Sequence, residues 1–281
     1  MSRHAAVSLL LFAPSLLFAS PQASGGSADL ALGIQAYKNA KYEEAAQHLE
    51  RAALSDPGNV QAHLYLASAY AEQYIPGSEE ELNVQQGNAA IREYRRVLEL
   101  DGKNLEAMKR LGQTYFQMKE LDQAIEAYRG AVGLDAKDPE LYYSIAVIEW
   151  TQTYQPRMEQ RAKLKLLPEQ PLIFAAICPT VRETNWERVA DGMEMLKKAI
   201  DLRHDYDDAT AYMNLMYRER ADVQCNEPAA RAADLKAADD WVDMTLAIKK
   251  RRTETQRRKT KSGSTSRLSG VTENPTAPNP Q

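Results

Sequence analysis

The sequence contains few of the residues, and none of the short motifs, on which common enzyme chemistry depends. Two cysteines and four histidines occur in 281 residues, and they form no HExxH, CxxC or CxxCH pattern of a metal or haem site. No GxGxxG, GKS or GKT run that would bind phosphates is present. No candidate nucleophile stands beside a candidate base. We therefore expect no metal site, no cofactor and no catalytic activity.

Long apolar runs are also scarce, and the one that occurs lies at the N-terminus. The segment from Ala5 to Ala19 is mostly apolar, follows a basic residue at Arg3 and precedes small residues, which is the layout of a secretory signal. A run of this length is too short to span a bilayer comfortably. We therefore expect residues 1–23 to be a cleaved signal peptide and the protein to be exported, to the periplasm or the extracellular space. An N-terminal membrane anchor is the alternative.

Charge is distributed unevenly along the chain. The formal net charge is −4, yet the stretch from Lys249 to Arg267 holds nine Lys or Arg residues and one acid, so the rest carries −12. The residues that follow are rich in Ser, Thr, Pro and Asn, which bury little apolar surface, and we expect residues 251–281 to be a basic, disordered tail. Such a tail could contact an anionic surface. Export and the lack of interleaved aromatic residues argue against nucleic acid.

The sequence does contain a helical periodicity, which is clearest from Leu105 to Asp138. Two apolar stripes occur there, each with the three- and four-residue spacing of one helix face, and the polar segment MKEL separates them. Small residues in both stripes let two antiparallel helices approach closely. The first stripe contains Leu111, Gly112 and Tyr115, and the second contains Ala124, Tyr128 and Ala131. This stretch therefore predicts a helical hairpin.

The same pattern recurs throughout residues 29–250. Copies start near residues 26, 60, 105, 139 and 207, and three of them carry extra residues at the turn of the hairpin, near 75–87, 151–183 and 221–232. Four prolines interrupt the middle segment, so we interpret 151–183 as an insertion with one short helix over MEQRAKLKLL. An irregular extra repeat is the alternative. Residues 24–28 contain Gly25-Gly26-Ser27 and are expected to form a flexible joint.

The recurring pattern resembles the tetratricopeptide repeat, a 34-residue unit with small residues where Gly112, Ala124 and Ala131 stand. The resemblance implies an all-α protein, a right-handed α-solenoid of about five helix hairpins with insertions at the turns within repeats. Each hairpin would bury its apolar faces only against its neighbours, so the stability of the array depends on its being contiguous.

In this family the residue after the position of Tyr115 faces the concave groove. The corresponding residues of the five copies are Tyr37, Ala71, Phe116, Trp150 and Arg218. Tyr143 lies seven residues before Trp150 on the same helix face and extends an aromatic strip. We therefore expect Tyr37, Phe116, Tyr143, Trp150 and Arg218 to form a partner-binding groove. The alternative is that these rings pack beneath the 151–183 insertion, which would fill the groove.

The two cysteines fall in consecutive insertions at the same kind of turn, which places Cys178 and Cys225 on one edge of the array. An exported chain meets an oxidising compartment, so we predict a disulfide between them. Two unrelated thiols are the alternative.

The sequence thus favours a non-catalytic protein–protein interaction scaffold of the cell envelope, with a peptide or protein partner in the groove. The alternative function is a structural or assembly subunit that docks through the insertion edge and the basic tail to an envelope complex or an anionic surface. The pattern defines neither the identity of the partner nor the oligomeric state.

Overall fold

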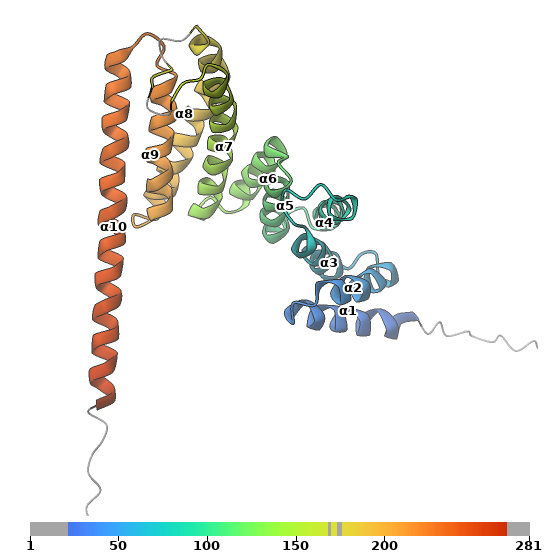
Figure 1. Cartoon of the computed structure of the whole chain (residues 1–281). Helices are drawn as coiled ribbons and strands as arrows, with labels where there is room; N and C mark the ends of the chain where they lie inside the picture. Colours follow the sequence, from blue (N-terminus) through green and yellow to red (C-terminus); the bar gives the residue numbers. More distant parts are fainter. Residues whose placement is uncertain (1–21, 168–169, 173–175, 269–281) are drawn as a thin grey trace, which may run out of the picture.

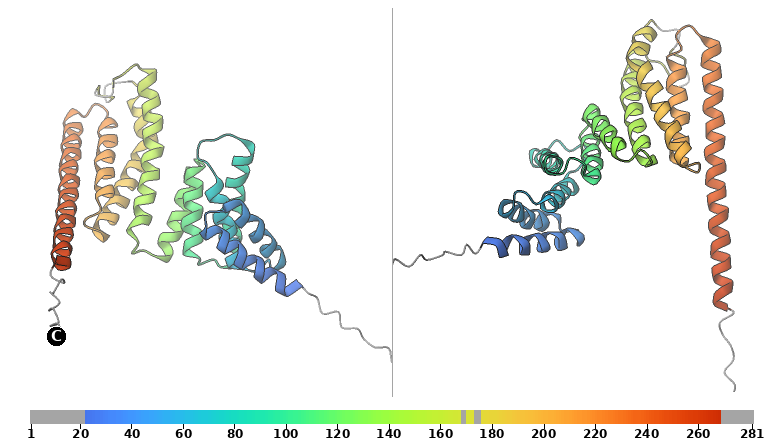
Figure 2. Two further views of the ribbon diagram at one scale, coloured as in Figure 1. Left: turned by 60° about the horizontal axis from the view of Figure 1, so that its bottom comes forward. Right: turned by 180° about the vertical axis from the view of Figure 1, so that it is seen from behind.

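The computed structural model describes residues 22–167, 170–172 and 176–268, and in this part of the chain ten α-helices and no strands occur. The helices follow one another in a single extended array of antiparallel neighbours (Figures 1 and 2). The predicted all-α solenoid is confirmed. The helices are α1 (Gln22–Lys38), α2 (Tyr42–Ser55), α3 (Val60–Gln73), α4 (Glu81–Leu100), α5 (Leu105–Gln117), α6 (Leu121–Leu134), α7 (Pro139–Lys163), α8 (Cys178–Leu202), α9 (Asp207–Asp222) and α10 (Pro228–Leu268).

The helices pair into five hairpins, which we number in chain order from α1/α2 to α9/α10. The first helices of hairpins 2 to 5 begin at Val60, Leu105, Pro139 and Asp207, where the sequence pattern places the starts of the copies. The expected signal peptide lies almost entirely outside the described residues. No helix in the described segments is both long and apolar enough to cross a bilayer.

A short polar sequence ends one hairpin and begins the next. Asn59 and Asn104 are the N-cap residues of α3 and α5, and their side-chain oxygens each accept a hydrogen bond from the backbone N–H three residues later at 3.0 Å. Asp138 caps α7 in the same way, through the N–H of Glu140 at 2.9 Å. These caps satisfy N–H groups that have no partner within the helix, so the repeated DPGN, DGKN and DAKD sequences fix the helix starts.

Close approach of the two helices within a hairpin depends on glycine. A Cβ atom on Gly112 would come within 2.9 Å of the Tyr128 ring, and one on Gly33 would come within 2.5 Å of the Leu49 side chain. Real Cβ atoms do not approach other atoms so closely, so the ring of Tyr128 can lie against α5 only because position 112 lacks a side chain.

The expected flexible joint at residues 24–28 is wrong, because α1 begins at Gln22 and includes it. Packing explains the difference. A Cβ atom on Gly26 would meet the hydroxyl of Ser55 at 2.5 Å, so the first part of α1 lies directly on the C-terminal end of α2. This tertiary contact stabilises helix in a segment whose glycines disfavour it in isolation.

The extra residues of hairpin 4 lengthen its helices instead of forming a separate helix or repeat. Helices α7 and α8 each contain 25 residues and pack against one another as one hairpin, so the irregular extra repeat is excluded. The short helix predicted over 158–167 is wrong, since α7 continues through Pro156 to Lys163. Contacts of this extension with α9 outweigh the hydrogen bond that Pro156 cannot donate. Parts of the other two insertions likewise extend α4, α9 and α10.

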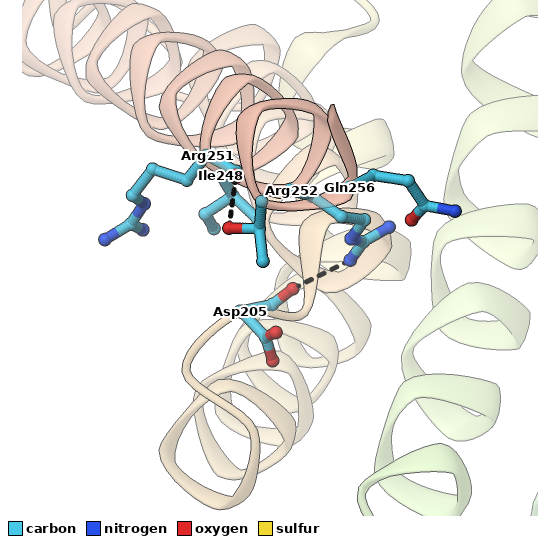
Figure 3. Close-up of a pocket in the computed structure, with 6 residues that line it drawn as sticks. Asp205, Ile248, Arg251, Arg252 and Gln256 are labelled. Carbon is cyan, nitrogen blue, oxygen red and sulfur yellow. Dashed lines mark hydrogen bonds between the residues drawn. The ribbon is translucent and has the colours of Figure 1, made fainter. Parts of the chain in front are cut away.

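The last helix, α10, is longer than the array requires. It packs on α9 through a buried stripe that includes Ala238, Thr245 and Ile248. Farther along α10, the guanidinium of Arg252 donates to the backbone oxygen of Asp205 at 3.1 Å (Figure 3) and to the carboxylate of Asp207 at 2.7 Å. Beyond this point the helix continues to Leu268.

The prediction that the chain is disordered from residue 251 is therefore wrong for residues 251–268. Residues 269–281 lie outside the described part of the chain. The helix persists because no Gly or Pro occurs between Pro228 and Gly263, and Lys, Arg, Glu and Gln are good helix formers.

Candidate functional site

The candidate site is an aromatic surface on the first helices of hairpins 4 and 5. First helices of successive hairpins approach one another, α1 with α3, α3 with α5 and α7 with α9, so their side is the inner side of the array. On α7, residues 143, 150 and 154 follow the spacing of one helix face. We define the aromatic strip as Tyr143, Trp150 and Tyr154 of α7 together with Tyr212 of α9. All four side chains are partly exposed.

The rings of the aromatic strip contact one another in a continuous series. Tyr212 is edge-on to Tyr143, with ring centroids 5.5 Å apart at 86°, and edge-on to Trp150 at 5.5 Å and 90°. Trp150 stacks on Tyr154 with centroids 4.7 Å apart. These geometries are the favourable ones for aromatic pairs, so the strip is held in shape before any ligand binds.

The polar atoms of the aromatic strip are suited to donating hydrogen bonds. Burial, and after it the neighbouring Tyr212, raises the pKa of Tyr143 well above its ordinary value, and burial raises the pKa of Tyr212. Both hydroxyls therefore keep their protons at physiological pH. The indole N–H of Trp150 is buried and has no hydrogen-bond partner among the described residues. A buried donor without an acceptor is costly, which favours any group that supplies one.

The connection between α7 and α8 does not fill the aromatic strip in the part that the structure describes. Leu172 of this connection is fully buried, in a separate cluster with Val181 and Val223. The strip instead packs against α9 through Tyr212. The alternative in which the predicted rings pack against the 151–183 insertion holds for one contact, because Tyr154 belongs to 151–183 and stacks on Trp150.

A polar cavity adjoins this face on the side of hairpin 3. Helices α5 and α7 supply charged and polar groups to it, and two of its cations are already paired: Lys109 with Asp138 at 2.8 Å and Arg110 with Glu106 at 2.6 Å. The lining residues include Glu106, Lys109, Arg110, Gln113, Glu140 and Ser144. The inner side thus offers apolar rings next to hydrogen-bonding groups of both charges.

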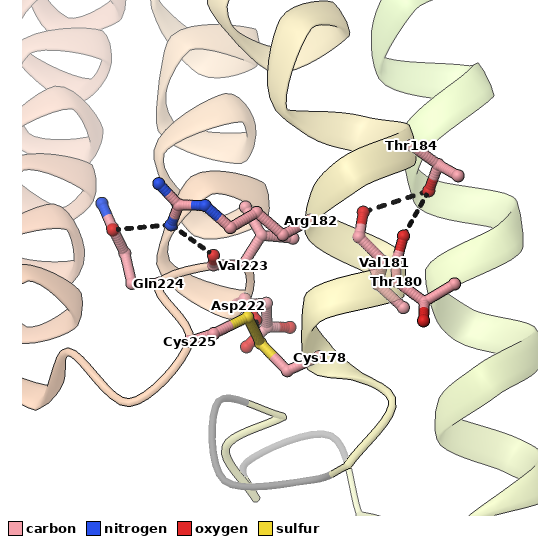
Figure 4. The surroundings of a disulfide bond; sticks show 9 residues. All are labelled: Cys178, Thr180, Val181, Arg182, Thr184, Asp222, Val223, Gln224 and Cys225. Carbon is pink, nitrogen blue, oxygen red and sulfur yellow. Dashed lines mark hydrogen bonds between the residues drawn. A yellow bond between two sulfur atoms is a disulfide. The ribbon is translucent and has the colours of Figure 1, made fainter.

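The structure joins the two cysteines as predicted. Cys178 is the first residue of α8, Cys225 lies in the connection between α9 and α10, and their sulfur atoms are bonded (Figure 4). Arg182 reinforces this junction by donating to the backbone oxygen of Val223 at 2.9 Å. The disulfide therefore fastens the turn end of hairpin 4 to that of hairpin 5.

Comparison with known proteins agrees with this architecture. Two tetratricopeptide-repeat family models match the chain, one over residues 84–148 and the other over residues 30–76. The chain is a tetratricopeptide-repeat protein. No curated protein matches the sequence significantly.

Solved structures with a similar fold include those of MamA. A crystal structure of the MamA protein has a TM-score of 0.56 and 16% identity, covering 82% of this tetratricopeptide-repeat chain and 95% of MamA. MamA from Desulfovibrio magneticus RS-1, residues 41 to the end, has a TM-score of 0.55 and 14% identity, with 82% and 97% covered. At these identities the likeness shows the fold alone.

The tetratricopeptide fold brings together only some of the predicted groove residues. Tyr143 and Trp150 are joined through Tyr212. Tyr37 lies in hairpin 1 against Tyr42 and Tyr65, and it belongs to a different apolar cluster. Phe116 is partly buried against the main core of the array. Arg218 is half-exposed and bonded to Asn214 at 2.9 Å and Asp239 at 2.8 Å.

Two members of the aromatic strip were missed from the sequence. Tyr154 could have been found, because it lies four residues after Trp150 on the same helix face. Tyr212 could not, because it occupies a different position of the repeat and meets Trp150 only across the packing of two hairpins.

Beyond the regular tetratricopeptide unit, a buried ion cluster braces the extensions of α7 and α9. Arg157 donates to both carboxylate oxygens of Glu219 at 2.6 and 2.7 Å and to Asp222 at 2.6 Å. Arg161 donates to the same Asp222 at 3.0 Å. Burial raises the pKa of Glu219, although its bonds to Arg157 act in the opposite direction. The two arginines thus neutralise the two carboxylates. The guanidinium of Arg157 also lies 5.5 Å from the ring centroid of Tyr154 and holds this ring at the end of the aromatic strip.

Proposed function

We propose that this tetratricopeptide-repeat protein is a non-catalytic scaffold that binds an extended peptide segment of a partner protein along the inner side of the array. The observation that carries the proposal is the preformed aromatic strip, a row of partly exposed rings on one face of α7 that Tyr212 of α9 joins. Aromatic anchors in a concave surface supply much of the binding energy in peptide recognition, because their large rigid rings lose little entropy on binding.

The dimensions and chemistry of the strip suit an extended peptide. Eleven positions separate Tyr143 from Tyr154, which corresponds to about 16 Å of helix or about five residues of extended chain. The rings would contact apolar side chains of the peptide. The protonated hydroxyl of Tyr143 would donate to a backbone carbonyl group of the peptide. The charged groups of the neighbouring cavity would bind polar residues of the peptide beyond the aromatic strip.

We also propose that the protein is exported and that its partner belongs to the cell envelope or the extracellular space. The disulfide between Cys178 and Cys225 supports this location, since such bonds persist in oxidising compartments. The apolar N-terminal segment is the corresponding sequence feature, and an N-terminal membrane anchor is the alternative to cleavage.

The test is a binding measurement on three proteins. Peptides selected from a displayed random library with the wild-type chain are labelled, and their affinities are measured by fluorescence anisotropy. We expect Trp150→Ala to weaken binding about tenfold to a hundredfold, the range of a central aromatic anchor. Tyr37→Ala removes an aromatic ring of hairpin 1 and is the matched control, which should bind like the wild type. Equal binding by Trp150→Ala, with the fold retained by circular dichroism, would place the ligand elsewhere.

A second candidate function is docking through the turn edge and the basic end of α10 to an envelope complex or an anionic surface. The observation that favours it is the basic stretch of α10 from residue 249 to residue 258, in which every residue is exposed. Deletion of residues 253–281 separates the two functions and keeps the side-chain bonds of Arg252 to Asp205 and Asp207. Peptide binding should survive this deletion, whereas docking through the basic end should not.

A further inference from the structure

A carboxylate without a counterion lies at one end of the aromatic strip. Asp208 is the second residue of α9 and precedes Tyr212 by four positions, which puts both side chains on the same face of the helix. Asp208 is exposed, and its carboxylate makes no hydrogen bond or ion pair within the part of the chain that the structure describes. A group that approaches Tyr212 from the inner side of the array therefore also approaches this carboxylate.

The charge of Asp208 acts on two rings of the aromatic strip. Burial is the main cause of the raised pKa of Tyr212, and the negative charge of Asp208 is the second. The pKa of Tyr143 is raised by burial, by Tyr212 and then by Asp208. Because the centroids of these two rings are 5.5 Å apart, the carboxylate and both rings belong to one end of the strip.

The other charged groups near the strip are already paired. Glu140, one turn before Tyr143 on α7, accepts a hydrogen bond from Arg203 at 2.6 Å. At the opposite end of the strip, Arg157 is bonded to Glu219 at 2.6 Å. Asp208 therefore gives one end of the strip a negative charge that no neighbouring cation compensates.

We propose that the peptide bound by the aromatic strip carries a lysine or arginine whose side chain pairs with Asp208 and lies against the rings of Tyr143 and Tyr212. The inference rests on the peptide-binding function proposed above and adds an element of its specificity. A carboxylate attracts such a cation through its charge, and the faces of aromatic rings attract it through their quadrupole. The methylene groups of the same side chain would cover apolar ring surface.

The place of Asp208 at one end of the strip also predicts the position of the basic residue in the peptide. Tyr143 and Trp150 are seven positions apart on α7, which corresponds to about 10 Å of helix or about three residues of extended chain. The basic residue should therefore stand about three residues from the apolar residue that contacts Trp150. It should lie at the end of the bound segment that is farther from Tyr154.

A double-mutant cycle between the protein and the peptide tests this contact. The peptides are those selected with the wild-type chain, and each is also made with its basic residue replaced by glutamine. Fluorescence anisotropy at low salt gives the affinities of both forms for the wild type and for Asp208→Asn. We expect either change alone to weaken binding about threefold to tenfold, the range of a partly exposed ion pair with a cation–π contact. Both changes together should weaken binding no further, because they remove the same interaction.

Charge reversal supplies a gain of binding that a folding defect cannot imitate. Asp208→Lys should bind the basic peptide more weakly than Asp208→Asn does, because it adds repulsion. It should bind a peptide with glutamate in place of the basic residue to within about threefold of the original pair. Asp201→Asn, the same change of side chain at an exposed position of α8, is the matched control and should bind every peptide like the wild type.

Three outcomes would overturn the proposal. Peptides that bind Trp150→Ala weakly but bind Asp208→Asn like the wild type use the aromatic strip without this contact, and the function proposed above then stands. Additive losses in the cycle place the basic residue of the peptide against another group. Peptides that bind Trp150→Ala like the wild type do not use the strip, and in that case the proposed function fails as well.

Discussion

Glu149 is a buried carboxyl at a position where other first helices carry an aromatic ring. Tyr70, Tyr115 and Tyr217 stand at the same position of α3, α5 and α9. The nearest cation of the Glu149 carboxylate is Arg188, at 3.6 Å, and the same oxygen has no hydrogen-bond partner. Burial and then the charge of Asp191 raise the pKa of Glu149 to about 7. The folded protein therefore binds a proton at Glu149 that the unfolded chain releases near pH 4.5.

This difference predicts how stability depends on pH. Between about pH 4.5 and pH 7 the folded state holds more protons than the unfolded state, so the free energy of unfolding falls as the pH rises through this window. Glu149→Gln removes the titration and should flatten the dependence. Relative to the wild type, the variant should gain about 1–3 kcal/mol on going from pH 5 to pH 8. Urea unfolding at both pH values measures the change.

The control for this prediction is Glu99→Gln, which alters a carboxyl that is 64% exposed. It should leave the pH dependence of the wild type unchanged. If Glu149→Gln and wild type lose stability equally between pH 5 and pH 8, Glu149 is ionised in the folded protein throughout this range.

At the residue scale, side chains at regular positions of the repeat could be predicted from the sequence. Side chains whose contacts come from a different helix could not. Tyr143 and Trp150 were predicted because they occupy regular positions of one helix. The charges around Glu149 were not predicted, because Arg188 and Asp191 lie on α8 and the sequence pattern does not pair them with Glu149. The pairing of Arg157 with Glu219 was hidden for the same reason, since these residues lie 62 positions apart.

At the scale of elements, the starts of helices were easier to predict than their ends. The N-cap residues Asn59, Asn104 and Asp138 are visible in the sequence as recurring polar tetrads. The ends of α7 and α10 were missed because tertiary contacts decide them. Pro156 suggested a break, but the buried Arg157 and Arg161 that follow it hold α7 against α9. The basic composition after residue 250 suggested disorder, but strong helix propensity without Gly or Pro continues α10.

The element most dependent on a single covalent bond is the junction of hairpins 4 and 5. Cys178→Ser/Cys225→Ser opens a loop closed across 47 residues, and we expect a loss of up to about 4 kcal/mol in the free energy of unfolding. The loss should be concentrated at the start of α8 and in the connection between α9 and α10, where Cys178 and Val223 are buried. Chemical denaturation measures the total, and hydrogen exchange of these backbone amides locates it.

A reductant provides the matched control for this experiment. It should lower the melting temperature of the wild type once free thiols can be titrated, and it should leave the double serine variant unchanged. Wild-type protein whose thiols are fully reduced and whose melting temperature is unaltered would show that the bond adds nothing to stability.

At the scale of the whole molecule, stability is a property of contiguous packing. One apolar core runs from α3 to α10, and a second cluster joins α1, α2 and α3. Hairpin 3 is the plain unit between the N-terminal hairpins and the two long ones that carry the disulfide and the aromatic strip. Because each hairpin is stabilised chiefly by its neighbours, a defect in hairpin 3 should uncouple the two ends of the array.

Gly112→Val in α5 introduces that defect, since a Cβ atom there would meet the Tyr128 ring at 2.9 Å.

The three tryptophans, Trp150, Trp186 and Trp241, all lie in hairpins 4 and 5, so their fluorescence reports on the C-terminal part alone, whereas circular dichroism reports on every helix. We expect coincident urea transitions for the wild type. In Gly112→Val the circular dichroism transition should begin at lower urea than the fluorescence transition, because hairpins 1 to 3 unfold while the disulfide-linked hairpins persist. Gly133→Ala, at a site with no neighbouring atom within 4 Å, should keep the two transitions together. Coincident transitions at lower urea in Gly112→Val would instead mean that the five hairpins unfold as one cooperative unit.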